Sequence, residues 1–477
     1  MKQAIPLILL LLMFSGAMSA SEESMLQLDV PVQGDWLWVS PDKPQITINI
    51  TNTSTTDTTV TALLLINTDK MQPYKTLDEQ SAVNAGQSIS VNFEVDAEPG
   101  FYQCTAIVND EVARTFVFGV DPQDIVSPPD YQPDFHDFWA STKHELAQVY
   151  TQYTLTEIPE KSTARRKVYL LEMHSLPDST GEVIARAYYA EPVADGNYPA
   201  IMHFYGYDGG SNEPWCMGGD DNPDCVEIAL STRGQQINNR PPYVNPYGDY
   251  FVSGFDSEYN YYYRGAYMDC VRGVDFLCSR PKVQKLNIFA EGGSQGGAFA
   301  LAAAALADDR LNAIAVAIPF MGDFPDYFQI ASWPGGSARA KKEELGMSDE
   351  EMFRMLSYFD TKNLATMITC PTYMNFSLQD NVCPPHTNWA AYNNLGSTDK
   401  RYSVNPTQGH QGPPNWRNEY MTFFAAHMKE TGSVNDVQID PNENDAIYNL
   451  QGIQVKGTWD TLPKGIYIQN GEKKAKL

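Results

Sequence analysis

The chain has 477 residues, and its 59 Asp and Glu outnumber its 33 Lys and Arg, which gives a formal net charge of −26. Hydrophobic residues make up 43% of the chain and charged residues 19%, so whole-chain disorder is excluded and a sizeable core is expected. Nucleic acids and anionic membrane surfaces repel an acidic protein, and the chain has no basic block to overcome this repulsion. We therefore expect neither as a partner, and instead expect a neutral one.

The N-terminus has the pattern of a secretory signal peptide. Lys2 precedes an apolar run over residues 4–14, and small residues follow over residues 15–20. This apolar run is too short to span a bilayer, and cleavage after Ala17 or Ala20 fits the pattern. No later segment approaches the roughly 18 uninterrupted apolar residues of a membrane span. We therefore expect a signal peptide at residues 1–20 and a secreted protein (periplasmic, cell-surface or extracellular) without membrane insertion.

Residues 21–121 predict an all-β accessory domain. Short runs alternate between apolar and polar residues and are separated by turn residues such as Pro99-Gly100 and Asn109-Asp110. Such period-two alternation is typical of antiparallel strands, and several strands within about 100 residues suggest an immunoglobulin-like sandwich. The runs cover residues 45–50, 60–66, 88–95, 102–108 and 114–120.

A proline-rich joint over residues 121–133 marks a domain boundary, and short apolar strands alternate with helical stretches after it. This alternation predicts an α/β domain over residues 122–432, with a doubly wound, mostly parallel sheet. The remaining residues, 433–477, form a polar tail with a short β segment. Predicted strands lie at 200–205, 286–290, 313–318 and 372–376, and predicted helices at 264–279, 299–307 and 415–431.

The strongest chemical signal is the run Gly292-Gly293-Ser294-Gln295-Gly296-Gly297 between a predicted strand and a predicted helix. A nucleophilic serine on a sharp strand-to-helix turn needs glycines on both sides to relieve steric clashes. We therefore predict Ser294 as the nucleophile; the alternative reading is a glycine-rich loop without catalytic function.

A serine nucleophile needs a base, and the base needs an orienting carboxylate. In this kind of fold the chain order is serine, acid, histidine, which leaves His386, His410 and His427 as bases. His410 lies in a glycine-flanked loop before the last long helix and is favoured, since the other two fit helix-start and helix-interior roles. For the acid we predict Asp380, which follows the strand at 372–376 and precedes His410 by 30 residues.

The oxyanion of an acyl-transfer intermediate needs preorganised N–H donors. One donor should be the backbone amide of Gln295, directly after the nucleophile, and the other should come from a loop after an earlier strand. The segment at 203–210 follows the strand at 200–205 and is rich in glycine, so we assign the second donor to Tyr207.

Together these motifs resemble the acetyl xylan esterases and cephalosporin C deacetylases of carbohydrate esterase family seven. The resemblance covers roughly residues 130–430 and implies an α/β-hydrolase fold, a Ser294–Asp380–His410 triad, and oxyanion donors at Tyr207 and Gln295. It also implies a supporting loop at Arg233, Gly234 and Gln235, a homo-oligomer, and no metal or cofactor. The matching residues are Tyr261 to Arg264, Asp269, Val271-Arg272, Gly292 to Gly297, Ser231 to Gln235, Gly206 to Gly210, Asp380 and Cys383 to Pro385.

Two features depart from the family's pattern. Gln411 stands where the family usually has Glu after the catalytic histidine, so we expect altered support of the site but a working enzyme. The N-terminal β region lies outside the usual single-domain plan and could block oligomer assembly.

Weaker signals have simple structural explanations. The acidic runs at 220–224 and 440–445 could hold calcium but are more typical of solvated turns, and the second lacks the Gly and Glu of an EF-hand. The tyrosines at 259–263 could stack on sugars or could equally pack the core beneath the site.

The sequence thus predicts a secreted serine esterase that removes acetyl groups from carbohydrate hydroxyls through an acyl-enzyme. The substrate, acetylated xylan or its oligosaccharides, is implied by the resemblance alone. Two other functions stay open: a broad-specificity esterase or peptidase on the same fold, and a non-catalytic surface protein whose sandwich binds glycan.

Overall fold

The computed structural model describes residues 25–207 and 224–430, and in the tail residues 447–448, 459, 462, 465–469 and 472–476. The predicted signal peptide, the glycines at 209–210 and most of both acidic runs lie outside these residues. The chain divides into two compact units, residues 1–428 and 429–477. Within the described part of the chain, no helix is both long and apolar enough to cross a bilayer.

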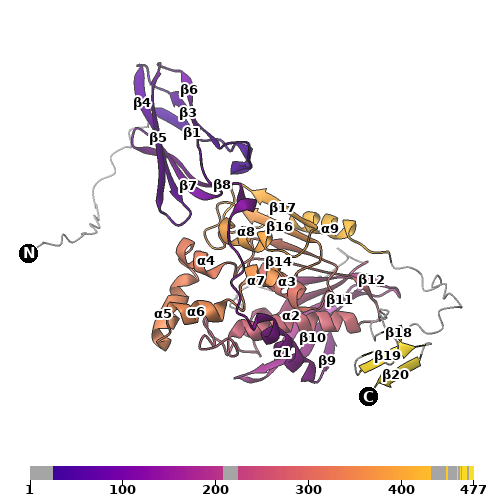
Figure 1. Cartoon of the computed structure of the whole chain (residues 1–477). Helices are drawn as coiled ribbons and strands as arrows, with labels where there is room; N and C mark the ends of the chain where they lie inside the picture. The colour runs from indigo at the N-terminus through magenta and orange to yellow at the C-terminus, as the bar shows by residue number, and fades with distance from the viewer. Residues whose placement is uncertain are drawn as a thin grey trace, which may run out of the picture. The chain divides into compact units, whose positions relative to one another are not determined.

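The N-terminal region consists of two sheets whose pairings are almost all antiparallel (Figure 1). Alternate residues of the strands are buried, for example Ile46, Ile48 and Ile50, and they join one apolar core. One sheet contains β1 (Leu26–Asp29), β3 (Gln45–Asn52) and β6 (Ser88–Glu94), and the other has the order β2 (Leu37–Trp38), β8 (Glu111–Val120), β7 (Gly100–Val108), β4 (Thr58–Thr68) and β5 (Pro73–Val83).

Strand β5 was not predicted from the sequence. Its residues are mostly polar and exposed, and it lies at the edge of its sheet, paired with β4 alone. An edge strand that faces solvent on both sides lacks the hydrophobic alternation by which a strand is recognised.

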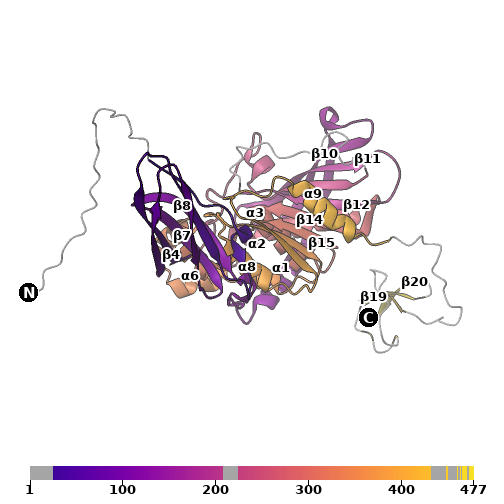
Figure 2. The same cartoon turned by 90° about the horizontal axis from the view of Figure 1, so that it is seen from above.

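The α/β region after the proline-rich joint, called the catalytic region below because it contains the predicted triad, is built on a nine-stranded sheet. Figure 2 shows this sheet and its helices from above. Strands β12 to β17 pair in parallel, while β9, β10 and β11 add an antiparallel end to the sheet. The order is β17 (Lys400–Asn405), β16 (Thr372–Ser377), β15 (Ala313–Ala317), β14 (Val283–Gly293), β12 (Tyr198–Phe204), β13 (Val226–Ser231), β11 (Gly181–Pro192), β10 (Arg166–Asp178) and β9 (Tyr153–Glu157).

Helices cover both faces of this sheet, because neighbouring residues of its buried strands point to opposite sides. Met202 and Ala290 belong to the core that contains helices α2 and α3, whereas Ile201 and Phe289 pack with α9. The helices are α1 (Phe135–Gln148), α2 (Tyr262–Ser279), α3 (Gln295–Leu306), α4 (Phe324–Ile330), α5 (Gly335–Leu345), α6 (Asp349–Leu356), α7 (Thr361–Ala365), α8 (Pro385–Asn393) and α9 (Trp416–Ala426).

The second unit contains a small antiparallel sheet of β18 (Ile447–Tyr448), β19 (Gly465–Gln469) and β20 (Glu472–Lys476). The short β segment predicted within residues 433–477 corresponds to this sheet. Strand β20 has the sequence EKKAK with Ala475 as its single apolar residue, so it has no apolar alternation from which a strand could be predicted.

Candidate active site

Ser294 lies at a sharp turn between strand β14, which ends at Gly293, and helix α3, which begins at Gln295. Its backbone has φ 57° and ψ −123°, a strained conformation for a residue with a side chain. The flanking glycines are required because other backbone atoms lie too close to them for a side chain to fit. A Cβ on Gly292 would lie 2.3 Å from the carbonyl oxygen of Gly296, and a Cβ on Gly296 would lie 2.2 Å from the carbonyl oxygen of Phe204.

His410 links Ser294 to Asp380. Its Nε2 lies 3.0 Å from the Ser294 Oγ, and its Nδ1 lies 2.8 Å from the Asp380 Oδ2. The other oxygen of Asp380 accepts hydrogen bonds from the backbone amides of Val382 and Cys383, at 2.8 and 2.9 Å. The Asp380 side chain is 0% exposed and the His410 side chain 27%, so the carboxylate is shielded while the imidazole reaches solvent.

The three side chains meet because their strands are parallel. Ser294, Asp380 and His410 follow β14, β16 and β17, and the carboxyl ends of these parallel strands share one edge of the sheet. The two other downstream histidines are not brought to Ser294: His386 contacts Asp69 and Asp326, and His427 contacts Asp399 and the Phe423 carbonyl.

The residues predicted as oxyanion donors, Gln295 and Tyr207, lie close to Ser294. Gln295 is the first residue of α3, where a backbone N–H has no acceptor within the helix. Its buried side chain donates to the Tyr263 hydroxyl at 2.7 Å and so points away from the reaction centre. A Cβ on Gly206 would lie 3.9 Å from the Ser294 Cβ, so the backbone leading into Tyr207 passes beside the serine.

Gln236 supports this loop and was not predicted from the sequence. Its Nε2 donates to the Gly206 carbonyl at 3.1 Å, and its own backbone has a positive φ of 40°. The motif match at 231–235 stops one residue short of Gln236, and a glutamine in a polar loop carries no signal of its own.

The predicted supporting loop acts through buried contacts. Arg233 donates to both carboxylate oxygens of Asp269, at 2.7 and 3.1 Å, and to Asp178 at 3.0 Å. Burial would lower the pKa of Arg233, but Asp269 raises it well above its usual value. The Gly234 carbonyl accepts from Tyr250 at 2.6 Å, and Gln235 donates to Tyr262 at 2.9 Å. These contacts hold the segment that ends in Gln236.

The tyrosine cluster packs the core rather than an open sugar site. Tyr261, Tyr262 and Tyr263 are buried, and burial raises the pKa of each phenol well above its usual value. Only Tyr259 of this cluster is exposed. Of the two interpretations left open by the sequence, packing therefore holds for three consecutive rings.

A different set of aromatic rings lies beside Ser294. The Phe320 amide donates to the Ser294 carbonyl at 3.0 Å, and the Phe320 ring stacks on Trp333 with centroids 5.1 Å apart. The Tyr207 ring meets Trp333 edge-on at 5.4 Å, and its hydroxyl donates to Asp249 at 2.6 Å. Tyr207 and Trp333 are partly exposed, and we call these two rings with Phe320 the aromatic wall.

Gln411, which replaces the family's usual glutamate, is tied to the site through its backbone. Its carbonyl accepts a hydrogen bond from the Ser377 hydroxyl at 2.7 Å, so the residue after His410 is fastened to the end of β16. This contact involves the backbone of residue 411, so it is open to a glutamine and a glutamate alike.

The fold and the site together place the chain among the serine hydrolases with the α/β-hydrolase fold. Within that class, residues 126–428 match the family described as acetyl xylan esterase (AXE1). This match covers more than half of the chain, and the protein belongs to the acetyl xylan esterase family. It is a carboxylic ester hydrolase.

Individual relatives agree with this assignment. The chain is 25% identical over 402 residues to the acetyl esterase Axe7A of Xylanibacter ruminicola, which covers 81% of this chain and 87% of the relative. The solved acetyl xylan esterase from Paenibacillus sp. R4 is 29% identical with a TM-score of 0.56, covering 64% of this chain and 98% of its own. Acetyl xylan esterase 1 from Thermoanaerobacterium sp. is 25% identical with a TM-score of 0.54, covering 65% and 98%.

Proposed function

We propose that the protein is a secreted serine carbohydrate esterase that removes O-acetyl groups from acetylated xylan or its oligosaccharides. The observation that carries this proposal is the hydrogen-bonded chain from Ser294 through His410 to Asp380 in a member of the acetyl xylan esterase family. The acetyl esterase and acetyl xylan esterases to which the chain is similar support the substrate class. The apolar run near the N-terminus supports secretion.

The proposed reaction has two steps. The Ser294 Oγ attacks the acetyl carbonyl while His410 accepts its proton, and the intermediate collapses as His410 protonates the departing sugar oxygen. The resulting acyl-enzyme is hydrolysed by water, with His410 again as base, and acetate leaves. Asp380 stabilises the imidazolium, and the amides of Gln295 and Tyr207 donate to the oxyanion.

The proposal predicts acetate release from acetylated xylo-oligosaccharides by the purified protein. We expect hydrolysis of 4-nitrophenyl acetate as well, with much slower turnover of the butyrate ester if the acyl pocket is small. A peptide 4-nitroanilide separates esterase from peptidase activity. Turnover of the anilide without release of acetate would contradict the proposal, as would inactivity toward both acetate esters.

The aromatic wall is expected to hold the sugar rather than the acetyl group, because flat rings suit the C–H faces of a pyranose. Trp333→Ala should raise KM for acetylated xylo-oligosaccharides by about 10-fold, since truncating a large aromatic contact costs about 1–2 kcal/mol. Turnover of 4-nitrophenyl acetate should change by less than about 2-fold, because this ester lacks the sugar. An equal loss on both substrates would place Trp333 in the acyl pocket instead.

A further inference from the structure

The N-terminal pair of sheets, called the sandwich below, forms hydrogen bonds with Gln379, the residue directly before the proposed catalytic acid Asp380. The Gln379 side chain accepts from the backbone N–H of Val117 in strand β8 at 2.7 Å and donates to the Val117 carbonyl at 3.0 Å. The same amide nitrogen lies 2.7 Å from the Pro406 carbonyl, in the segment between β17 and His410. One side chain therefore joins three parts of the molecule: the sandwich, the segment 379–386 that contains Asp380 (the acid loop), and the segment 406–410 that ends in His410 (the histidine loop).

A second contact holds the other end of the acid loop. His386, at the start of α8, lies 2.6 Å from Asp69 in the turn between β4 and β5 and 3.1 Å from Asp326 in α4. Lys70 of the same turn pairs with Asp326 at 2.5 Å, and Asp323 lies within the same group of side chains. The sandwich thus reaches both ends of the segment 379–386, which contains Asp380.

Charge strengthens this second contact. Burial would lower the pKa of His386, but hydrogen bonds to Asp326 and Asp69 and their negative charges raise it to about 9. Hydrogen bonding to His386 is also the main cause that lowers the pKa of Asp326. Because the folded-state pKa is raised, the stability from protonated His386 is complete below about pH 6.5 and is lost as the pH rises through about 9.

The acid loop has room to move if these contacts are cut. A cavity of about 110 Å³ lies between sandwich residues, among them Phe101 and Val117, and the loop residues Asp380 and Asn381. Apolar packing therefore leaves this boundary partly unfilled, and the polar contacts at Gln379 and His386 join the sandwich to the loop across it.

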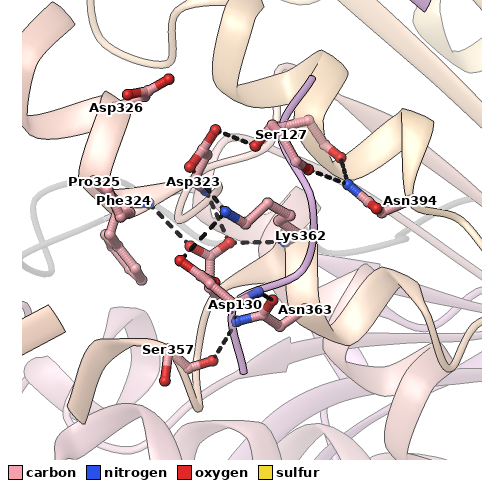
Figure 3. A network of polar contacts seen from close by, with 12 residues as sticks. Ser127, Asp130, Asp323, Phe324, Pro325, Asp326, Ser357, Lys362, Asn363 and Asn394 are labelled. Carbon is pink, nitrogen blue, oxygen red and sulfur yellow. Dashed lines mark hydrogen bonds and ion pairs between the residues drawn. The ribbon is translucent and has the colours of Figure 1, made fainter. Parts of the chain in front are cut away.

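The connection between sandwich and catalytic region is itself anchored, as Figure 3 shows. Lys362 pairs with Asp323 at 3.0 Å and with Asp130 of the connecting segment at 3.4 Å. Asn363 donates to Asp130 at 2.9 Å, and Asn394 donates to the Ser127 carbonyl at 2.8 Å. The proline-rich joint therefore lies against the catalytic region and helps to hold the sandwich against the acid loop.

We propose that the sandwich serves as a clamp on the acid loop, with Gln379 and His386 as positioning residues that keep Asp380 aligned with His410. This inference rests on the proposed triad. Displacing a catalytic group by about 1 Å can cost about 100-fold in rate, so a loop held from outside its own domain is a sensitive point.

The test uses the full chain and 4-nitrophenyl acetate, a small ester with no sugar to contact the sandwich. Gln379→Met keeps the length of the side chain but removes its three hydrogen bonds, and we expect kcat to fall about 10- to 100-fold with KM within about 2-fold. Gln379→Glu can still accept from Val117 but should not restore kcat, because its second carboxylate oxygen would face the Val117 and Pro406 carbonyls, to which only a donor can bond. Asp69→Asn should lower kcat about 3- to 10-fold, because it weakens only the charged contact to His386.

Matched controls separate the clamp from general damage. Gln284→Met removes an amide-to-carbonyl hydrogen bond elsewhere in the catalytic region, to Asn197, and Asp57→Asn changes an acidic residue in another sandwich loop. Both should keep kcat within about 2-fold. Full activity of Gln379→Met and Asp69→Asn would overturn the clamp. If Gln379→Met fails to fold, Asp69→Asn decides alone, and retained activity of Ser294→Ala would instead overturn the triad.

Discussion

Ser294→Ala is expected to reduce kcat for acetate release by at least about 10⁴-fold, because alanine offers no nucleophile while the rest of the site still binds substrate. The fold of the variant should survive. The substitution removes the side-chain hydrogen bond to His410 but keeps the flanking glycines on which the strained turn depends. The measurement compares acetate release from acetylated xylo-oligosaccharides by the two proteins. A fluorophosphonate probe should label the wild type and leave the variant unlabelled.

Ser332→Ala is a suitable control, because Ser332 is an exposed serine that directly precedes Trp333 of the aromatic wall. It should keep full activity and full labelling. Labelling of Ser294→Ala at the wild-type level would show that another residue is the nucleophile, and the triad would then have to be reassigned.

Arg233→Met is expected to lower the free energy of unfolding by about 3–5 kcal/mol, the largest stability loss that we predict. The variant removes the charged partner of Asp269, whose side chain is 0% exposed, and a buried carboxylate without a counter-charge is costly. Urea unfolding followed by tryptophan fluorescence measures the effect. The Arg233→Met, Asp269→Asn double variant should recover part of the loss, because it removes the buried charge.

Arg354→Met provides the comparison, since Arg354 pairs with Glu258 but its side chain is 44% exposed. An exposed pair contributes about 0–1 kcal/mol, so this variant should stay within about 1 kcal/mol of the wild type. Equal losses for the two arginine variants would mean that the buried contacts of Arg233 do not support the loop as we infer.

The regular elements of the core were predictable where burial imposes a pattern. Predicted strands at 200–205, 313–318 and 372–376 correspond to β12, β15 and β16, because buried strands are continuous apolar runs. The predicted helix at 299–307 begins earlier, at Gln295, since glycines that disfavour a helix in isolation are needed there for close approach to β12. Polar edge strands such as β5 and β20 left no such pattern.

The sequence by itself determined the strand-to-helix turn at Ser294, the predicted nucleophile, because the steric demands of such a turn are met by six consecutive residues at 292–297. Asp380 and His410 could be ranked by position, but their contacts join residues 30 and 116 positions apart and depend on strand order. Only the tertiary structure shows which partners Gln236, Gln379 and His386 contact: the Gly206 carbonyl, strand β8 and Asp69, respectively. Each is an ordinary polar residue whose role depends on partners brought near by folding.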